Sequence, residues 1–299
     1  MTPTAQRQQS IGVAAAAAAY LVWGLFPLYF HALQGVPAGE VLAHRVAWSA
    51  LFMAALVTAL RRWPTVLLQL RRPGVMRTLT ASALLISTNW LVYIWAVQSG
   101  RVLEASLGYF ITPLVSVLLG VVFLREPLSR RQVAAVALAA AGVLWMVLRV
   151  GKVPWVALTL AGSFGLYGLL RKQVPVDAVA GLLAEVVVLA PLAVGWLLWL
   201  TWRGAGHLGS SPGVTALLTL TGVVTAVPLL LFGAGARLIP LSLIGLLQYM
   251  APTIQFLLGV LVYGESFTPE RVVGFGIIWL ALVIYTTEGV FRRRQVARA

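Results

Sequence analysis

Apolar runs of about 20 residues recur along the whole chain and constrain its fold more than any other feature. Sixty per cent of the 299 residues are hydrophobic and 10% are charged, whereas a soluble domain carries about 25% charged residues. A helix of about 20 residues crosses a bilayer, and inside lipid the backbone must satisfy its own hydrogen bonds. We therefore predict an all-α membrane protein. Its ten transmembrane helices are expected at residues 11–33, 38–60, 75–98, 103–124, 130–148, 153–171, 179–200, 213–236, 239–263 and 268–288.

Composition also excludes several classes of site. The chain has no cysteine, so disulfides, thiolate metal ligands and cysteine nucleophiles are excluded. The net charge of +14 could indicate a nucleic-acid partner, but the basic residues gather in short loops, where they orient a membrane protein. We expect no nucleic-acid partner, no metal and no cofactor.

The distribution of basic residues predicts the orientation. If the N-terminus is cytoplasmic, sixteen Lys and Arg fall on the cytoplasmic side, five on the outer side, and Arg45 lies within a span. Basic residues favour the cytoplasmic side of short loops. Both termini are therefore predicted to be cytoplasmic.

A stretch that occurs twice predicts how the helices are grouped. Residues 107–131 and 246–270 share the tetrapeptide LLGV and align at an offset of 139. We predict two five-helix units, 1–150 and 151–299. An odd number of spans per unit makes the two units enter the membrane from opposite sides, which is the inverted repeat of many secondary transporters.

Prolines and polar stripes indicate which helices face the interior. A proline frees a carbonyl one turn upstream, and such breaks are tolerated where they face protein or a wet cavity. The predicted helix breaks are Pro27, Pro113, Pro228 and Pro252. Residues at helical spacing select one face of each helix. The predicted substrate cavity is lined by Trp23, Asn89, Trp90, Tyr93, Tyr109, Thr112, Tyr167, Thr225, Gln248 and Gln255. Helix packing is the alternative explanation for the Ser and Thr residues of these stripes.

Charged residues inside the predicted spans are candidates for a proton or charge relay, namely Glu185, His44 and Arg45. An intramembrane carboxylate is a functional candidate by default. The alternative for Glu185 is an ion pair with Arg171 or Lys172. For His44 and Arg45 it is a bundle-stabilising cluster with Glu40 that also uses Glu104.

No catalytic motif accompanies these residues: the chain has no HExxH, P-loop or GxSxG sequence. We therefore expect a protein that is not an enzyme.

Several long segments together resemble the RarD-type proteins of the EamA family, in the drug/metabolite transporter superfamily. The residues that carry the resemblance are 20–30, 43–49, 89–120, 164–172 and 225–260. Thr112 and Gln98 depart from the family pattern, in which we expect Asn. The resemblance implies a bacterial inner-membrane protein with a central cavity between the first, third, fourth, sixth, eighth and ninth helices. It also implies export of a small molecule.

These observations together predict a secondary transporter that works by alternating access around a midplane cavity. Its expected partners are a small metabolite, amino acid or drug and the lipid bilayer, with protons as a candidate coupling ion. We expect a monomer or weak dimer. The alternative is a flippase for a lipid or lipid-linked substrate, and a membrane-embedded enzyme or a channel is less favoured.

Overall fold

The computed structural model describes residues 3–125, 130–236, 238–239 and 247–296. Within these ranges the chain forms helices and turns, with no strand. The helices are α1 (Pro3–Gly24), α2 (Phe26–His31), α3 (Ala38–Ala59), α4 (Trp63–Leu70), α5 (Val75–Gln98), α6 (Val102–Leu124), α7 (Arg130–Val150), α8 (Trp155–Gln173), α9 (Ala178–Trp202), α10 (Pro212–Ala236), α12 (Met250–Leu257), the π-helix η1 (Leu258–Val262) and α13 (Pro269–Val296).

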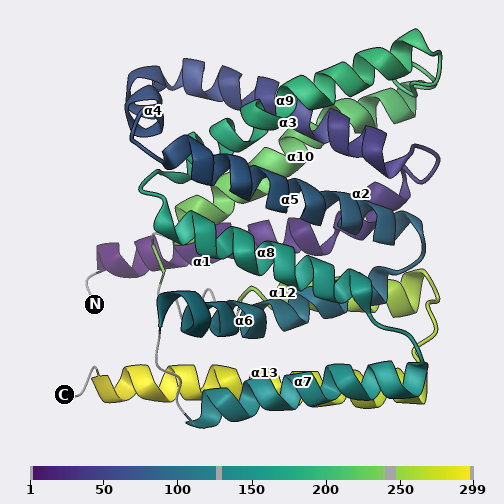
Figure 1. Ribbon diagram of the computed structural model, residues 1–299. Helices are drawn as coiled ribbons and strands as arrows, with labels where there is room; N and C mark the ends of the chain where they lie inside the picture. The colour runs from purple at the N-terminus through teal and green to yellow at the C-terminus, as the bar shows by residue number, and fades with distance from the viewer. Residues whose placement is uncertain (1–2, 126–129, 237, 240–246, 297–299) are drawn as a thin grey trace.

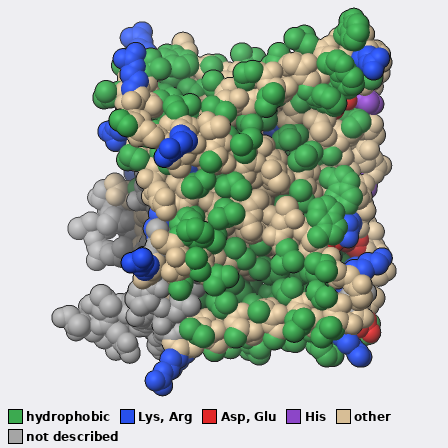
Figure 2. Space-filling view, in the orientation of Figure 1, with side chains coloured by type: hydrophobic (Ala, Val, Ile, Leu, Met, Phe, Trp, Pro, Cys, Tyr) green, Lys and Arg blue, Asp and Glu red, His purple; other side chains and the backbone are tan. Residues whose placement is uncertain are grey.

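The long helices lie roughly side by side, and both ends of the chain are at the same end of the bundle (Figure 1). Segments distant in sequence pack together. The main pairs are α3 with α9 and α10, α5 with α8 and α9, α1 with α10 and α12, α6 with α8 and α12, and α7 with α13. Apolar side chains cover much of the face in Figure 2, and the Lys and Arg side chains there lie mostly toward its two ends. This distribution suits a bundle that crosses a bilayer.

Seven helical segments in the described part of the chain are long and apolar enough to span a membrane. They are Arg7–His31, Ala38–Ala59, Val75–Gln98, Val102–Phe123, Arg130–Arg149, Ala178–Trp202 and Pro212–Gly235. Their bounds lie within a few residues of predicted spans. The helices α8, α12, η1 and α13 overlap the other three predicted ranges, but part of the range 239–263 lies outside the described residues.

Two elements were not predicted. The short helix α4 occupies a segment expected to be a loop; Pro64 stands in its first turn, where a missing N–H costs no helical hydrogen bond. The first predicted span is interrupted at Leu25, so that Pro27 stands in the first turn of α2. By contrast, Pro113 and Pro228 lie inside the continuous helices α6 and α10.

Glycine allows two pairs of helices to approach closely. A Cβ on Gly222 of α10 would lie 2.5 Å from the backbone carbonyl of Trp48 in α3, and one on Gly108 of α6 would lie 2.8 Å from the carbonyl oxygen of Ala157 in α8. Since backbone cannot move aside as a flexible side chain can, these contacts fix the α3–α10 and α6–α8 distances. These interfaces, together with the contacts of α5 with α3 and α8, bring the side chains of α3, α5, α6, α8 and α10 together.

Candidate functional site

Arg45 lies in the second turn of α3 at the centre of a cluster of aromatic side chains. It is 4% exposed. Its guanidinium carbon lies 4.2 Å from the ring centroid of Trp90 and 5.5 Å from those of Phe26 and Phe30. Its Nε donates a 2.7 Å hydrogen bond to Thr225 Oγ1. Helices α2, α3, α5 and α10 thus meet around one buried cation, and we call Arg45, Trp90, Thr225, Phe26 and Phe30 the Arg45 cluster.

Asn89 connects α5 to α6 and α8 beside this cluster. Its Nδ2 donates to Leu160 O and to Ser163 Oγ, both at 3.0 Å. Its Oδ1 accepts a 3.1 Å bond from the Tyr109 hydroxyl. The ring of Tyr109 lies 5.7 Å from that of Tyr93, whose buried hydroxyl has no partner among the described residues. The carboxamide is fully engaged, which offsets the cost of burying it.

Glu185 belongs to a second buried cluster, formed with Ser82, Tyr167 and Arg171. It accepts a 2.6 Å bond from Ser82 Oγ and a 3.4 Å bond from the Tyr167 hydroxyl, and Arg171 Nε lies 3.7 Å from its Oε1. The structure therefore contains the ion pair with Arg171 that the sequence left as an alternative to a proton site. It also separates Tyr167 from the Arg45 cluster, because the Tyr167 hydroxyl is directed to Glu185.

His44 adjoins Arg45 in sequence but interacts with a different group. Its Nε2 lies 3.9 Å from Glu40, and its Nδ1 has no partner among the described residues. Glu40 is bound more closely by His207, whose backbone N–H and Nδ1 lie 2.6 and 2.7 Å from its two oxygens. Glu40 therefore links the start of α3 to the segment between α9 and α10.

The remaining predicted cavity residues are dispersed. Trp23 packs against Tyr20 and Phe232, and its carbonyl accepts a 3.0 Å bond from Gln255 Nε2. Thr112 donates to Gly108 O in its own helix, and Gln248 is half-buried just before α12. The carbonyl of Pro252 in α12 accepts a 2.8 Å bond from Ser106 Oγ of α6.

Asp177 caps α9 and ties it to α4. Its Oδ1 accepts bonds from the N–H groups of Val179 and Ala180, and its Oδ2 accepts 2.8 Å bonds from Arg62 and Gln69. Burial raises the pKa of this carboxyl, but the hydrogen bonds and the charge of Arg62 outweigh burial and bring its pKa below the usual value. We call Asp177, Arg62 and Gln69 together the Asp177 latch.

Near the start of α3, two carboxylates and one side-chain amide form hydrogen bonds with the backbone of neighbouring loops and helix starts. Glu265, in the loop before α13, accepts bonds from the N–H groups of Val102 and Leu103 at the start of α6. Burial raises the pKa of Glu265, although these bonds and the Arg271 charge oppose the rise. Glu104 accepts a 3.0 Å bond from the N–H of Val156 at the start of α8, and Gln98 donates to the carbonyls of Leu33 and Val36. Buried N–H groups at helix starts thereby gain acceptors.

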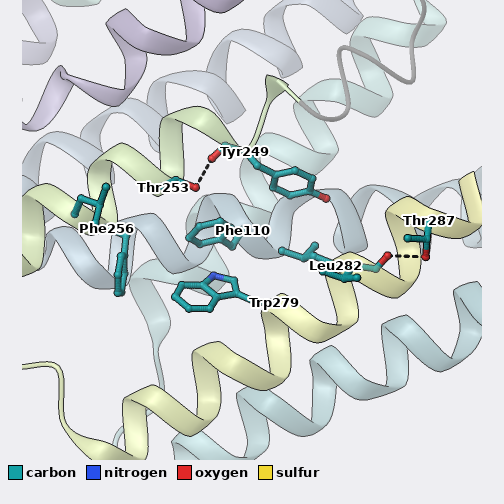
Figure 3. A pocket seen from close by; sticks show the side chains of 9 residues that line it. Phe110, Tyr249, Thr253, Phe256, Trp279, Leu282 and Thr287 are labelled. Carbon is teal, nitrogen blue, oxygen red and sulfur yellow. Dashed lines mark hydrogen bonds between the residues drawn. The ribbon is translucent and has the colours of Figure 1, made fainter. Parts of the chain in front are cut away.

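An apolar pocket of about 550 Å³ lies between α6, α12 and α13 (Figure 3). None of the predicted cavity residues lines it. Its walls are mostly aromatic and aliphatic, and the hydroxyls of Thr253 and Thr287 donate to carbonyls of their own helices. The lining residues are Phe110, Tyr249, Thr253, Phe256, Leu257, Trp279, Leu282, Val283 and Thr287.

Two of these groups of contacts were not predicted from the sequence, namely the pair of Glu40 with His207 and the ring of contacts around Arg45. His207 was not considered as the partner of Glu40, and its position just after a predicted span was the available signal. The ring of contacts around Arg45 joins residues up to 180 positions apart. Helical periodicity alone gives no pairing between such residues. Within the described residues, no group of three or more His, Asp and Glu side chains could hold a metal ion.

Comparison with known proteins gives consistent results. Residues 10–148 match the EamA-like transporter family. The chain is 46% identical to the "Uncharacterized transporter YojE" of Bacillus subtilis (strain 168), over 95% of this chain and 96% of that protein. It is 43% identical to "Protein RarD" of Escherichia coli (strain K12), over 98% and 99%. It is also 36% identical to the "Chloramphenicol-sensitive protein RarD" of Pseudomonas aeruginosa, over 96% and 97%.

The fold is also similar to that of a solved crystal structure. Its TM-score is 0.58 at 21% sequence identity, and the match covers 96% of this chain and 99% of the other. At this identity the likeness concerns the fold alone.

Proposed function

Since the chain is a RarD-type member of the EamA family and a multi-pass bacterial inner-membrane transporter, we propose that it is a secondary transporter working by alternating access. In this proposal ten helices form two inverted five-helix units, 1–150 and 151–299, with both termini cytoplasmic. A small metabolite, amino acid or drug binds near the midplane and is exported. The observation that carries the proposal is the set of polar and aromatic residues of α2, α3, α5, α6, α8 and α10 around Arg45 and Asn89.

The helix packing supports the two-unit arrangement. An offset of 139 pairs α1 with α8, α3 with α9, α5 with α10, α6 with α12 and η1, and α7 with α13. If each helix is replaced by its counterpart, the α1–α10 contact becomes α8–α5, the α3–α10 contact becomes α9–α5, and the α6–α8 contact becomes α12–α1. All three resulting pairs are also in contact in the structure. The contacts α3–α9, α6–α12 and α7–α13 are each formed by a helix and its own counterpart, so they are unchanged. A pseudo-two-fold axis in the membrane plane accounts for this pattern.

The polar contacts between the units support alternating access. Glu40 at the start of α3 binds His207, which follows α9. Asp177 at the start of α9 binds Arg62, which follows α3. These two links lie at opposite ends of α3. The helix ends that they join exchange under the same offset, although the linking residues themselves do not align residue by residue. In the proposed cycle each opens when its end of the cavity opens.

The proposal is tested by transport in proteoliposomes that contain the purified protein. A panel of amino acids and drugs is offered with and without a pH gradient. We expect accumulation of at least one compound, and a rate that rises with the gradient if protons are the coupling ion. Glu185→Gln removes the charge of the candidate proton site and should abolish the effect of the gradient. If none of the compounds is transported, the proposed transport function is contradicted.

Asn89→Ala tests the location of the site, and Thr88→Ala is its matched control. The Asn89 carboxamide bonds to Leu160, Ser163 and Tyr109, whereas the exposed Thr88 bonds only to Leu84 in its own helix. We expect transport to fall at least tenfold in the first variant and to stay near the wild-type rate in the second. Thermal unfolding shows whether each variant is folded before transport is compared. Equal rates in the two variants would remove Asn89 from the site.

The alternative, a flippase, is favoured by one observation. The pocket between α6, α12 and α13 has an apolar lining, which suits an acyl chain. Fluorescent phospholipids in both leaflets of proteoliposomes measure this activity through quenching by dithionite from outside. Faster exposure of the inner-leaflet label than in protein-free vesicles would support the flippase, and Trp279→Ala should then slow it.

A further inference from the structure

Arg45 carries a buried charge that no acid in the described part of the chain neutralises. The nearby acids of α3 and α9 are engaged elsewhere, since Glu40 binds His207 and Glu185 lies against Arg171. The hydrogen bond to Thr225 uses Nε. The two terminal nitrogens, which form the paired bonds to carboxylates, have no acceptor among the described residues.

An unpaired charge in a membrane span is unfavourable, and such residues normally pair or mark a substrate pathway. Cation–π contacts with Trp90, Phe26 and Phe30 offset part of this cost. They do not provide hydrogen-bond acceptors for the terminal nitrogens. The guanidinium is thus held in place by the hydrogen bond of Nε and by the aromatic rings that it contacts. Its two terminal nitrogens remain available to bind a carboxylate.

A second unpartnered group lies beside it. The Tyr93 hydroxyl is buried and has no partner among the described residues, and the Phe30 ring contacts both the guanidinium of Arg45 and the ring of Tyr93. A hydroxyl donates readily to an anion. Phe30 packs edge-on against the Tyr93 ring, with centroids 6.0 Å apart, so an apolar surface adjoins both donors.

From this geometry we infer that the Arg45 cluster binds the carboxylate of an anionic ligand with an aromatic or other apolar body. The carboxylate pairs with the terminal nitrogens of Arg45 and accepts from Tyr93. The apolar body packs against the surrounding rings. This inference rests on the proposed transport function, because it names the substrate class of the same cavity.

The charge of the site also defines what it rejects. An ammonium group placed here would face Arg45 without any acid in the described cluster to offset the repulsion. The inference therefore predicts a preference for an anion over the matching neutral compound, and for either over the matching amine.

Three compounds that share a phenylethyl body and differ only in the head group test this order. They are 3-phenylpropionate, 3-phenylpropionamide and phenethylamine. Binding to the purified full-length protein in nanodiscs is measured by calorimetry, with thermal unfolding as a second readout. We expect 3-phenylpropionate to bind at least tenfold more tightly than the amide and phenethylamine, because hydrogen bonds to charged groups are worth about ten- to a hundredfold in affinity. Equal or tighter binding of the amide or the amine would overturn the inference.

Binding measurements on two variants and one control variant test whether the anion binds at Arg45 and Tyr93. Arg45→Gln should reduce the affinity for 3-phenylpropionate about ten- to a hundredfold and leave that for the amide nearly unchanged. Tyr93→Phe keeps the ring and removes only the unpartnered hydroxyl, so it remains informative if Arg45→Gln does not fold; we expect a several-fold loss, again confined to the anion. Arg149→Gln is the control, because Arg149 also stacks on a tryptophan, Trp145, but is exposed at the end of α7. Unchanged anion affinity in Tyr93→Phe and in a folded Arg45→Gln variant would overturn the assignment.

The outcome separates this inference from the carrier. If 3-phenylpropionate binds through Arg45 but no compound crosses the proteoliposome membrane, the anion site is supported and the proposed transport function is contradicted. If a neutral or cationic compound is transported and the anion neither binds nor competes with it, transport is supported and the anion site is contradicted.

Discussion

At the residue scale, the buried polar groups differ in how completely they are satisfied. Asn89 and Glu185 are surrounded by partners from other helices, whereas Arg45 keeps its terminal nitrogens free within the described structure. A satisfied polar group stabilises one arrangement of helices, and an unsatisfied one is a strain unless a ligand completes it. This contrast, rather than the number of polar residues, identifies Arg45 as the centre of the candidate site.

Asp177 gives a stability prediction at the same scale. Asp177→Ala removes the cap of α9 and its bonds to α4, and the loss of a helix cap costs about 0.5–2 kcal/mol. Asp177→Asn keeps a capping oxygen but removes the charge that Arg62 binds, so we expect a smaller loss. Thermal unfolding of the two variants in detergent measures the difference. Equal unfolding midpoints for wild type and Asp177→Ala would show that the latch contributes nothing.

The same carboxyl predicts a pH dependence. Its pKa is lower in the folded protein than in the unfolded chain, so the ionised form stabilises the fold. This contribution is fully present above the ordinary aspartate pKa of about 4 and is lost as the pH falls through the lower folded value. Midpoints measured from pH 7 to pH 3 should fall less steeply on the acid side for Asp177→Asn than for wild type. Parallel curves would contradict the prediction.

At the element scale, close helix contacts decide which side chains can meet. The short distance between α3 and α10 depends on Gly222, and the same interface places Thr225 within a hydrogen bond of Arg45. Small residues allow such approach in membrane helices, where packing drives association. The site is therefore sensitive to residues that do not touch it.

Gly222→Ala tests this dependence, and Gly233→Ala in the same helix is its control. The added methyl group would lie 2.5 Å from the Trp48 backbone in the first variant and 3.5 Å from Ala178 Cβ in the second. Overpacking of this kind costs about 1–3 kcal/mol, whereas alanine in place of an unconstrained helical glycine is favourable by about 0.5–1 kcal/mol. We expect a lower unfolding midpoint and weaker anion binding for Gly222→Ala only. Similar midpoints in both variants would mean that α3 and α10 separate without cost.

At the scale of the whole molecule, the two halves are related in packing but not in chemistry. Glu40 with His207 and Asp177 with Arg62 occupy corresponding places at opposite ends of α3. The positions equivalent to Arg45 and Asn89 at the offset of 139 are Ala184 and Pro228. In the proposed carrier the related contacts would serve the movement and the unrelated residues would serve recognition.

The absence of cysteine makes the proposed topology directly testable. Single cysteines are introduced at exposed loop positions by Gly35→Cys, Ser210→Cys, Arg71→Cys and Gln173→Cys. With both termini cytoplasmic, a membrane-impermeant maleimide should label the first two in intact cells and the last two only after permeabilisation. The cysteine-free parent is the control. Labelling of all four positions from one side would refute the inverted arrangement, and the reverse pattern would refute the cytoplasmic location of the termini.

The sequence by itself determined what depends on local composition. Apolar runs of spanning length predict helices in a bilayer because each run must satisfy its own backbone hydrogen bonds there, and seven of them appear as apolar helices of spanning length in the described structure. Full-length similarity to RarD-type proteins confirms the predicted family. The inverted repeat and the predicted cavity residues stay predictions.

Only the tertiary structure decided which polar residues meet. Periodicity assigns Arg45, Trp90 and Thr225 to faces of three helices, but it gives no rule for pairing those faces. The pairing follows from helix contacts across 45 to 180 positions of sequence, set by residues such as Gly222 that carry no chemistry of their own. For the same reason Tyr167 joins Glu185 and Glu40 joins His207. Partner choice is a property of the packed bundle, whereas the tendency to span the membrane is a property of each segment.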